Sequence, residues 1–214
     1  MKRIAVIGAG TLGVHIAHYL HQDDNMSFAG FYDDIQQKGT TTDYGAVIGS
    51  FNDIHSDFEK KVFDQLLIGV GYNNINARQQ LYERFASDIP FATYVHPTAY
   101  VDPSAEIGFG TVVFPGCVFD RNALIRDNVL LNISCSIAHD TEVNSGCFLG
   151  PGVKLSGFVT VGKSCFLGVG TTVINNITVC DNVQTGGGTV VISNINESGV
   201  YVGVPSRLIK SVHT

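Results

Sequence analysis

A single histidine–aspartate pair, His139 and Asp140, stands in an otherwise small and aliphatic segment, "NISCSIAHDTEVNSGCFLG" (residues 132–150). Imidazole is the side chain best suited to act as a general base near neutral pH, and an adjoining carboxylate can hold its tautomer. Gly157, 18 residues after His139, adds a position without a side chain. If it lies beside the imidazole, it leaves space for a ligand and offers a backbone N–H to a carbonyl. Acyl transfer requires at least a general base and a hydrogen-bond donor for the oxyanion, and these residues could supply both.

The spacing around this pair follows a six-residue repeat, which predicts the element that positions it. Every sixth residue from Val95 to Val191 is a large aliphatic residue or Phe, with Thr185 as the exception. The residue four places further on is small or β-branched throughout and accounts for four of the five cysteines. Such a repeat is typical of a left-handed parallel β-helix of hexapeptide repeats, in which three repeats form one coil and residues 18 apart stack. His139 then points outward beside Gly157, and these four cysteines point into the core.

The first part of the chain has a different pattern, in which strands and helices alternate. Strands are expected at residues 3–8, 27–34 and 63–71, and amphipathic helices at 11–22 and 76–87. This alternation predicts a small parallel sheet with helices on its faces. We therefore expect an α/β half-Rossmann βαβαβ domain at residues 1–92, followed by the β-helix domain at 93–214.

The turn "GAGTLG" at residues 8–13 lies between the first strand and the first helix, and it fits the GxGxxG pattern. Its glycines allow a phosphate group to approach the backbone at a helix N-terminus. A complete NAD site uses two βαβ halves, whereas this domain ends after one, so a mononucleotide diphosphate fits better. Gly8, Gly10 and Thr11 are the candidate contacts, and the alternative is a Gly-rich turn that binds no ligand.

Polar residues after the next two strands complete the candidate nucleotide site, because ligands bind at the carboxyl ends of parallel strands. Asp33 and Asp34 end the second strand and could accept hydrogen bonds from a base or ribose, or form an Asx turn. Gly71 and Asn73 follow the third strand, and Arg78 stands in the helix after it. Arg78 is either a substrate contact or a solvated helix residue.

The composition excludes several other classes of protein. The net charge is −6 and Lys and Arg do not cluster, which argues against binding to nucleic acid. The apolar stretch after Met1 breaks at Gly8, too early for a signal peptide, and no segment is long enough to span a membrane. We therefore expect a cytoplasmic protein. The five cysteines include no CxxC pair, and the coil has two histidines, too few for a three-imidazole metal site, so no metal is expected.

The whole chain resembles the sugar O- and N-acyltransferases of the sialic acid O-acetyltransferase type. Among these it is most similar to the bacterial N-acetyltransferases of nucleotide-linked 4-amino-6-deoxy sugars. The resemblance rests on "IAVIGAG", "FYDD", "VHPTAYVDPSAEIGFGTVV", "SIAHDTEV" and "VYVGVPSRLIK". It implies that His139 is the general base, that Asp140 orients it, and that the Gly157 amide binds the thioester carbonyl of acetyl-CoA.

The resemblance also implies further contacts. Asn132 would lie near the sugar, and the Gly-rich turn with Asp33 and Asp34 would hold uridine diphosphate. The arm of coenzyme A would contact a set of residues in the coil and near the C-terminus: Gly168, Val169, Gly187, Gly203, Pro205 and Arg207. The residue after His139 is Asp where many relatives have Glu, and "GTLG" also departs from their pattern. Such coils usually form homotrimers, which would place the coenzyme between subunits.

The expected reaction is direct transfer of an acetyl group from acetyl-CoA to the amino group of a nucleotide-linked, UDP-type sugar. An O-acetyltransferase would use the same base and coenzyme. Two other classes stay open. An NAD-dependent oxidoreductase would explain the Gly-rich turn at residues 8–13 and Asp33, but it would give His139 no role in the reaction. A solenoid scaffold or sensor would make His139 and Asp140 a surface ion pair.

Overall fold

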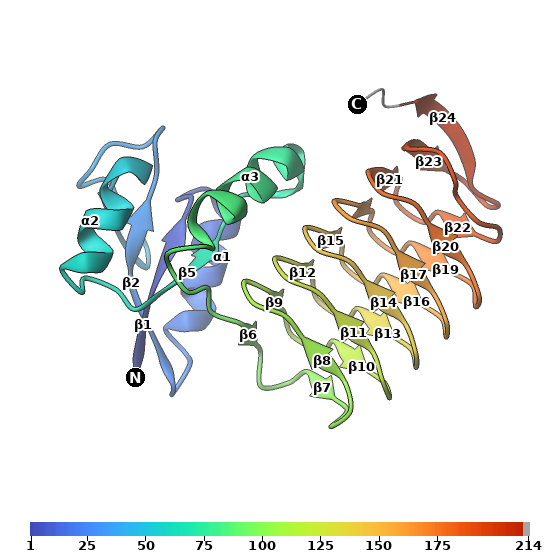
Figure 1. Cartoon of the computed structure of the whole chain (residues 1–214), viewed down its shortest axis with the longest axis horizontal. Helices are drawn as coiled ribbons and strands as arrows, with labels where there is room; N and C mark the ends of the chain where they lie inside the picture. The colour runs from blue at the N-terminus through green and yellow to red at the C-terminus, as the bar shows by residue number, and fades with distance from the viewer. Residues whose placement is uncertain (212–214) are drawn as a thin grey trace. The chain divides into compact units, whose positions relative to one another are not determined.

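The structure is a computed structural model that describes residues 1–211 and, at Tyr72, the backbone alone. The chain divides into two compact units, residues 1–92 and the residues from 93 onward. Each unit is built on one of the two sequence patterns (Figure 1).

The first unit is an α/β domain that opens with strand β1 (Lys2–Ile7), helix α1 (Thr11–Leu20) and strand β2 (Met26–Tyr32). A short hairpin follows, made of β3 (Thr41–Thr42) and β4 (Gly45–Gly49). The 3-10 helix η1 (Phe51–Asp53) and helix α2 (Ile54–Glu59) lead to strand β5 (Gln65–Ile68). The 3-10 helix η2 (Tyr72–Asn74) and helix α3 (Ile75–Phe85) end the series.

The sheet of this unit has the order β3-β4-β2-β1-β5, and only β3 runs antiparallel to its neighbour. β1 lies between β2 and β5 and is fully buried from Ile4 to Ile7, as expected for a strand covered on both faces. The three predicted strands and two predicted helices are present. The hairpin and α2 were missed, because two- to six-residue elements are too short to show a period.

The second unit is a coil whose strands from β6 to β20 have two residues each and are separated by four-residue corners (Figure 1). Its strands lie in three sheets, which we name by one member each. The β13 face has the order β22-β19-β16-β13-β10-β7, and the β14 face has the order β20-β17-β14-β11-β8. The β15 face has the order β24-β23-β21-β18-β15-β12-β9-β6. From β6 to β22, neighbouring strands are 18 residues apart, as in the pairing of Ser136 with Lys154, so three hexapeptides make one coil.

The bounds of these strands follow the repeat. They are β6 (Tyr94–Val95), β7 (Tyr100–Val101), β8 (Glu106–Ile107), β9 (Val112–Val113), β10 (Val118–Phe119), β11 (Leu124–Ile125), β12 (Leu130–Leu131), β13 (Ser136–Ile137), β14 (Glu142–Val143), β15 (Phe148–Leu149), β16 (Lys154–Leu155), β17 (Thr160–Val161), β18 (Phe166–Leu167), β19 (Thr172–Val173), β20 (Thr178–Val179), β21 (Val183–Thr185), β22 (Val190–Val191), β23 (Gly199–Val202) and β24 (Arg207–Ser211). The last two form an antiparallel pair that closes the end of the coil.

The core of the coil is built from the two rows that the sequence predicted. The aliphatic row fills it from the strands, and the small row, with Cys117, Cys135, Cys147 and Cys165, fills it from the corners. All four of these cysteines are fully buried. Their prediction as interior residues is therefore confirmed.

The corners have a conformation that repeats with the same period. One residue in every hexapeptide from 110 to 188 has a positive φ. Most of these residues are Gly, Asn or Ser, and the others are Asp140 and Phe158: Gly110, Gly116, Asn122, Asn128, Ser134, Asp140, Gly146, Gly152, Phe158, Ser164, Gly170, Asn176, Asn182 and Gly188. Gly, Asn and Asp tolerate this left-handed region best, and a bulky side chain there is an outlier.

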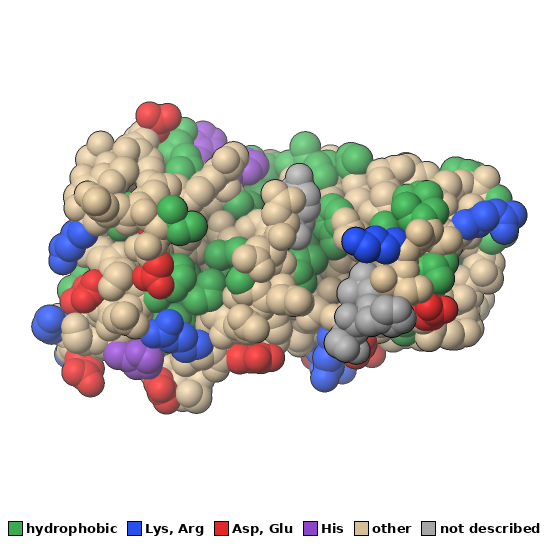
Figure 2. All heavy atoms as spheres, turned by 90° about the horizontal axis from the view of Figure 1, so that it is seen from above, with side chains coloured by type: hydrophobic (Ala, Val, Ile, Leu, Met, Phe, Trp, Pro, Cys, Tyr) green, Lys and Arg blue, Asp and Glu red, His purple; other side chains and the backbone are tan. Residues whose placement is uncertain are grey.

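On the side shown in Figure 2, Lys and Arg side chains lie singly among acidic and neutral residues. Within residues 1–211, no helix is long and apolar enough to cross a membrane.

Candidate active site

His139 lies at the corner that follows strand β13, where the chain passes from the β13 face to the β14 face. The 18-residue stacking gives it two neighbours in the adjoining coils, Arg121 before it and Gly157 after it. Its side chain is 42% exposed, so the imidazole is open to a ligand while one side packs on the coil. The predicted outward orientation is confirmed.

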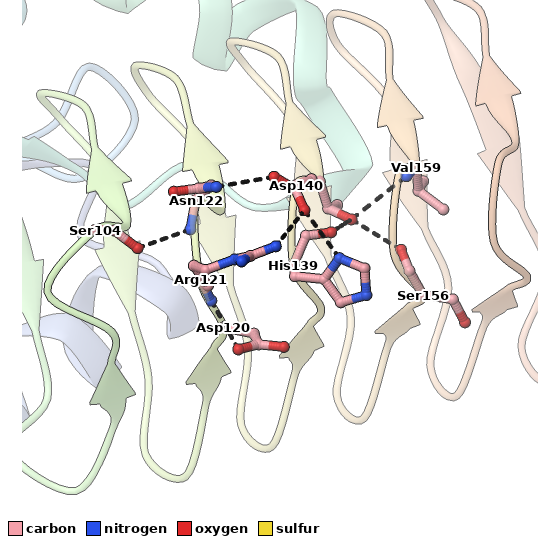
Figure 3. A network of polar contacts seen from close by, with 9 residues as sticks. Ser104, Asp120, Arg121, Asn122, His139, Asp140, Ser156 and Val159 are labelled. Atoms are coloured by element: carbon pink, nitrogen blue, oxygen red, sulfur yellow. Dashed lines mark hydrogen bonds and ion pairs between the residues drawn. The ribbon is translucent and has the colours of Figure 1, made fainter.

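Asp140 occupies the left-handed position of this corner, with φ of 55°. Its carboxylate Oδ2 lies 3.0 Å from His139 Nδ1, so the predicted pair is formed even though the acid is Asp rather than Glu (Figure 3). A short side chain suits this backbone conformation, which Asp tolerates better than most residues. The hydrogen bond thereby holds the imidazole with Nδ1 directed toward Asp140.

Two residues of the preceding coil, Arg121 and Asn122, also bind this carboxylate (Figure 3). Asn122 Nδ2 donates to Oδ1 of Asp140 at 2.9 Å, and Arg121 Nη2 donates to Oδ2 at 3.3 Å. Hydrogen bonds from Asn122 and His139, with the nearby Arg121 guanidinium, lower the pKa of Asp140. Neither residue was predicted from the sequence, although stepping back 18 places from His139 and Asp140 would have found them.

Gly157 leaves the space that the imidazole occupies. A Cβ at this position would lie 2.7 Å from His139 Cε1 and 2.8 Å from Nε2, closer than any normal contact. Among the described residues, none accepts a hydrogen bond from the Gly157 amide N–H. Gly157 itself is buried, and an N–H without an acceptor next to an imidazole is the arrangement expected of an oxyanion donor beside a base.

The hydrogen bond at Nδ1 determines which ring nitrogen is available for chemistry. The Asp140 carboxylate can only accept, so in the neutral form of His139 the proton is on Nδ1 and Nε2 is the unprotonated nitrogen. Nε2 lies next to Gly157. The pair can therefore take a proton from a bound nucleophile and hold the imidazolium that results.

The cysteines near this corner are not suited to nucleophilic chemistry. Cys135 and Cys147 are fully buried, and their thiols donate to the carbonyls of Gly150 and Gly162. The contact with Cys117 and burial both raise the pKa of Cys135, and burial raises that of Cys147 well above its usual range. A thiol that stays protonated is inert.

The predicted sugar contact and the first coenzyme contacts lie at a different corner of the coil. Asn132 follows β12, Gly168 and Val169 follow β18, and Gly187 follows β21, so all four leave the β15 face. His139 leaves the β13 face. Asn132 Oδ1 is bound to the amide of the next residue, Ile133, at 2.8 Å. Within one chain, these residues and His139 therefore stand on opposite sides of the two-residue strands of the β13 face.

The remaining coenzyme candidates lie in the turn between β23 and β24 and at the first residue of β24. Gly203 has φ of 96°, a value that favours glycine, and its carbonyl accepts from the Val190 amide. Pro205 follows a cis peptide bond, and Gly203, Pro205 and Arg207 are all exposed. This turn is held to the last complete coil and leaves the Arg207 side chain open to solvent.

In the first unit, the Gly-rich turn is shaped by close packing at two glycines and is open at a third. Gly8 has φ of 99°, and a side chain on Gly13 would collide with the Gly8 carbonyl oxygen. A Cβ on Gly10, at the start of α1, would meet no atom within 4 Å, and Thr11 is exposed beside it. The open backbone at residues 10–11 is where an anionic group could approach the helix N-terminus.

Asp33 organises this turn from within the chain. Its Oδ2 accepts from the Ala9 amide at 2.7 Å, and its Oδ1 accepts from the Ile35 and Gln36 amides at 2.8 Å. Burial alone would raise the pKa of Asp33, but these amides outweigh it and lower the pKa. The Asx-turn interpretation therefore describes Asp33. Gln36, which was not predicted from the sequence, fastens the same turn by donating to the Ala9 carbonyl.

The other nucleotide candidates differ in exposure. Asp34 and Asn73 are exposed and Gly71 is half-buried, whereas Arg78 is fully buried. Arg78 Nη1 donates to the carbonyls of Ile68, at 2.8 Å, and Val70, at 3.3 Å, at the end of β5. Burial lowers its pKa to about 10. Its interpretation as a solvated helix residue is wrong, because the side chain supports the loop after β5 from inside the domain.

In the part of the chain that the structure describes, no group of three or more His, Cys, Asp or Glu side chains could hold a metal ion.

Comparison with known families gives a match to the first unit. The family model described as the PglD N-terminal domain matches residues 3–85. A comparison with curated protein sequences found no match.

Solved structures match the whole chain. PerB from Caulobacter crescentus, in complex with CoA and GDP-perosamine, is 26% identical with a TM-score of 0.90, and the match covers 98% of each chain. The acetyltransferase domain of PglB from Neisseria gonorrhoeae is 28% identical with a TM-score of 0.86, covering 98% of this chain and 100% of that domain. WeeI from Acinetobacter baumannii, at 23% identity and a TM-score of 0.84, covers 98% and 100% and shares the fold.

These matches confirm the predicted fold class, a half-Rossmann domain followed by a left-handed β-helix. They also confirm the predicted resemblance: the chain has the architecture of the sugar N-acetyltransferases of the hexapeptide-repeat family.

Proposed function

We propose that the chain transfers an acetyl group from acetyl-CoA to the amino group of a nucleotide-linked 4-amino-6-deoxy sugar. The observation that carries this proposal is the His139–Asp140 pair, 3.0 Å apart, with the open N–H of Gly157 beside it. The relatives support the substrates. PerB was crystallised with CoA and GDP-perosamine, and the PglB domain with acetyl-coenzyme A.

His139 acts as the general base in a direct transfer. The sugar amine attacks the thioester carbonyl carbon, and Nε2 takes the proton that the nitrogen loses. Asp140 holds Nδ1–H and stabilises the imidazolium, while Arg121 and Asn122 keep the carboxylate in place. The carbon–sulfur bond then breaks, and the imidazolium returns the proton to the coenzyme thiolate. A positioned base typically contributes about 10²–10⁴-fold to the rate.

Gly157 supplies the oxyanion donor in this reaction. The carbonyl oxygen of the thioester becomes negatively charged in the tetrahedral intermediate, and the Gly157 N–H stabilises it. One such donor is typically worth about 3 kcal/mol. Because residue 157 has no side chain, the same position also admits the imidazole next to the reacting carbon.

The nucleotide part of the acceptor binds in the first unit. The open turn with Gly8, Gly10 and Thr11, together with Asp34, Gly71 and Asn73, binds the nucleotide, and Asp33 and Arg78 shape the loops around it. Uridine diphosphate is the nucleotide that the sequence resemblance favours. Because PerB binds a GDP-sugar, a guanosine nucleotide belongs in any test.

A homotrimer would complete the site. Asn132, Gly168, Val169 and Gly187 stand at a different corner from His139, and an outward-facing coil surface has no pocket of its own. Packing the coils around a threefold axis would bring the coenzyme corner of one copy to the base of the next. Gly203, Pro205 and Arg207 would then hold the far end of the coenzyme. Since acetyl-CoA is a metabolite of the cytoplasm, the reaction would take place there.

The proposal is tested by following thiol release from acetyl-CoA with UDP-, dTDP- and GDP-linked 4-amino-6-deoxy sugars. The wild type, His139→Ala and Cys135→Ala are assayed in parallel. We expect turnover with one amino sugar, a loss of several orders of magnitude in His139→Ala, and full activity in Cys135→Ala.

Other outcomes of this experiment point to the other classes. Turnover only with 4-hydroxy analogues would indicate an O-acetyltransferase. Binding of NADH without binding of acetyl-CoA would support the oxidoreductase, and binding of neither would leave a scaffold. Full activity of His139→Ala would contradict the mechanism.

A further inference from the structure

Phe158 occupies a backbone position that is unfavourable for its side chain. It has φ of 60°, the left-handed conformation that recurs once in every hexapeptide. In the neighbouring coils the equivalent residues are Asn122, Asp140 and Asn176, which tolerate this conformation. A bulky aromatic residue there is a genuine outlier, and such strain persists where the surrounding structure or a function requires it.

The packing of the coil does not explain why Phe158 is retained. Its ring points away from the core, and the residue is 55% exposed. The interior beneath this corner is filled without it, by Val159 and Thr141. An exposed aromatic ring in a strained position therefore needs a role on the surface.

The role is indicated by the ring's neighbour. The Phe158 ring lies 5.2 Å from the His139 imidazole, centroid to centroid, at an interplanar angle of 86°. This edge-to-face geometry is a favourable arrangement for aromatic pairs. Of the rings that the structure describes in contact with Phe158, His139 is the only one.

The stacking of the coil also places Phe158 directly after Asp140, 18 residues along the chain. The Phe158 amide donates to the His139 carbonyl at 3.2 Å, which ties the two corners together. Asp140 is thus flanked by Asn122, which binds its carboxylate, and by Phe158. The imidazole is bounded by Asp140 at Nδ1, by Gly157 at Nε2, and by the Phe158 ring.

We propose that Phe158 is a positioning residue, which holds the His139 imidazole against Asp140 with Nε2 directed toward the reacting groups. The ring limits rotation of the imidazole and covers one side of it against water. This inference deepens the proposed function and rests on it, because the ring acts through His139. The contact between the Phe158 ring and the imidazole explains why an aromatic residue is kept in a strained backbone position.

The test compares Phe158→Asn, which places the residue of Asn122 and Asn176 at this corner, with Phe158→Tyr, which keeps the ring. We expect Phe158→Asn to lower kcat about tenfold, since misplacing a catalytic group by an ångström can cost about 10²-fold. The KM values for both substrates should change less than about twofold. Phe158→Tyr should retain near wild-type kcat.

Two further variants separate positioning from structure. In the His139→Ala background, Phe158→Asn should cause no additional loss of kcat, because the residue through which the ring acts is gone. Ser164→Asn is the matched control, since Ser164 has φ of 53° at a corner that carries none of the proposed site residues. It should leave kcat unchanged. The melting temperature and the oligomeric state are measured for every variant.

The outcomes that overturn the inference are distinct from those that overturn the proposed function. Wild-type kcat in Phe158→Asn, or an equal loss in the His139→Ala background, overturns the inference alone. So does loss of the oligomer or a fall in melting temperature of more than about 5 °C, because the ring would then hold subunits or the coil together. No turnover by the wild type with any acceptor overturns both.

Discussion

Replacing Gly157 with alanine tests the geometry of the site most directly, because the effect can be worked out from two distances. The added Cβ would lie 2.7 Å from His139 Cε1 and 2.8 Å from Nε2. Ordinary contacts of a Cβ begin near 3.4 Å, so the imidazole must move by about 0.7 Å. Gly157 has no positive φ, so the backbone itself accepts alanine without strain.

Displacing the base should affect catalysis far more than stability. A misplacement of about 1 Å can cost about 10²-fold in rate, which corresponds to about 2.7 kcal/mol in the barrier. His139 is 42% exposed, so the imidazole can move toward solvent without disturbing the buried core of the coil. We expect kcat to fall about 10²-fold and the free energy of unfolding to change by less than about 1 kcal/mol.

The assay measures thiol release under saturating acetyl-CoA, and unfolding is followed by circular dichroism because the chain has no tryptophan. In the His139→Ala background, Gly157→Ala should cost little more, since the clashing group is absent. Wild-type kcat in Gly157→Ala would refute the arrangement of base and glycine described above. An equally large loss in the His139→Ala background would show that the methyl group obstructs substrate rather than the imidazole.

Three more predictions concern neighbouring contacts. Asp140→Asn should lower kcat by about 10²-fold or more with little change in KM, because an amide can present its N–H₂ to Nδ1 and favour the wrong tautomer; unchanged kcat would contradict the role of the carboxylate. Cys135→Ala should keep full activity and lose about 1–2 kcal/mol of stability in urea unfolding, since it removes buried volume and no reacting group. Asp33→Asn should destabilise the protein by about 1–3 kcal/mol at pH 7 because it disturbs three amide hydrogen bonds to a carboxylate. Because the pKa of Asp33 is lowered in the folded state, the stability difference between the wild type and Asp33→Asn should be complete above the ordinary aspartate pKa of about 4. It should shrink as the pH falls through the lowered pKa. A difference that stays constant from pH 7 to pH 3 would contradict a lowered pKa.

The sequence alone determined the architecture of the coil, because each hexapeptide repeats one local rule. An aliphatic residue at every sixth position must be buried, and a small residue four places later must fit a narrow interior. These requirements also fixed which residues lie 18 apart in stacked coils, so the spacing by itself groups His139, Asp140 and Gly157. The inward direction of Cys135 and Cys147 followed from the same register.

Only the tertiary structure decided how side chains meet across coils and loops. The binding of Arg121 and Asn122 to Asp140, and the contact of Phe158 with His139, depend on rotamers that no period specifies. In the first unit, Arg78 has the sequence context of an exposed helix residue but is buried because α3 lies over the end of β5. Asp33 accepts from three amides for a similar reason, since the N–H of the buried residue Ala9 needs an acceptor and the turn after β2 places two more amides beside the same carboxylate. The repeat determines burial within each hexapeptide, and it can therefore be read from the sequence. These contacts instead join segments far apart in the sequence, and they depend on how those segments pack in the folded chain.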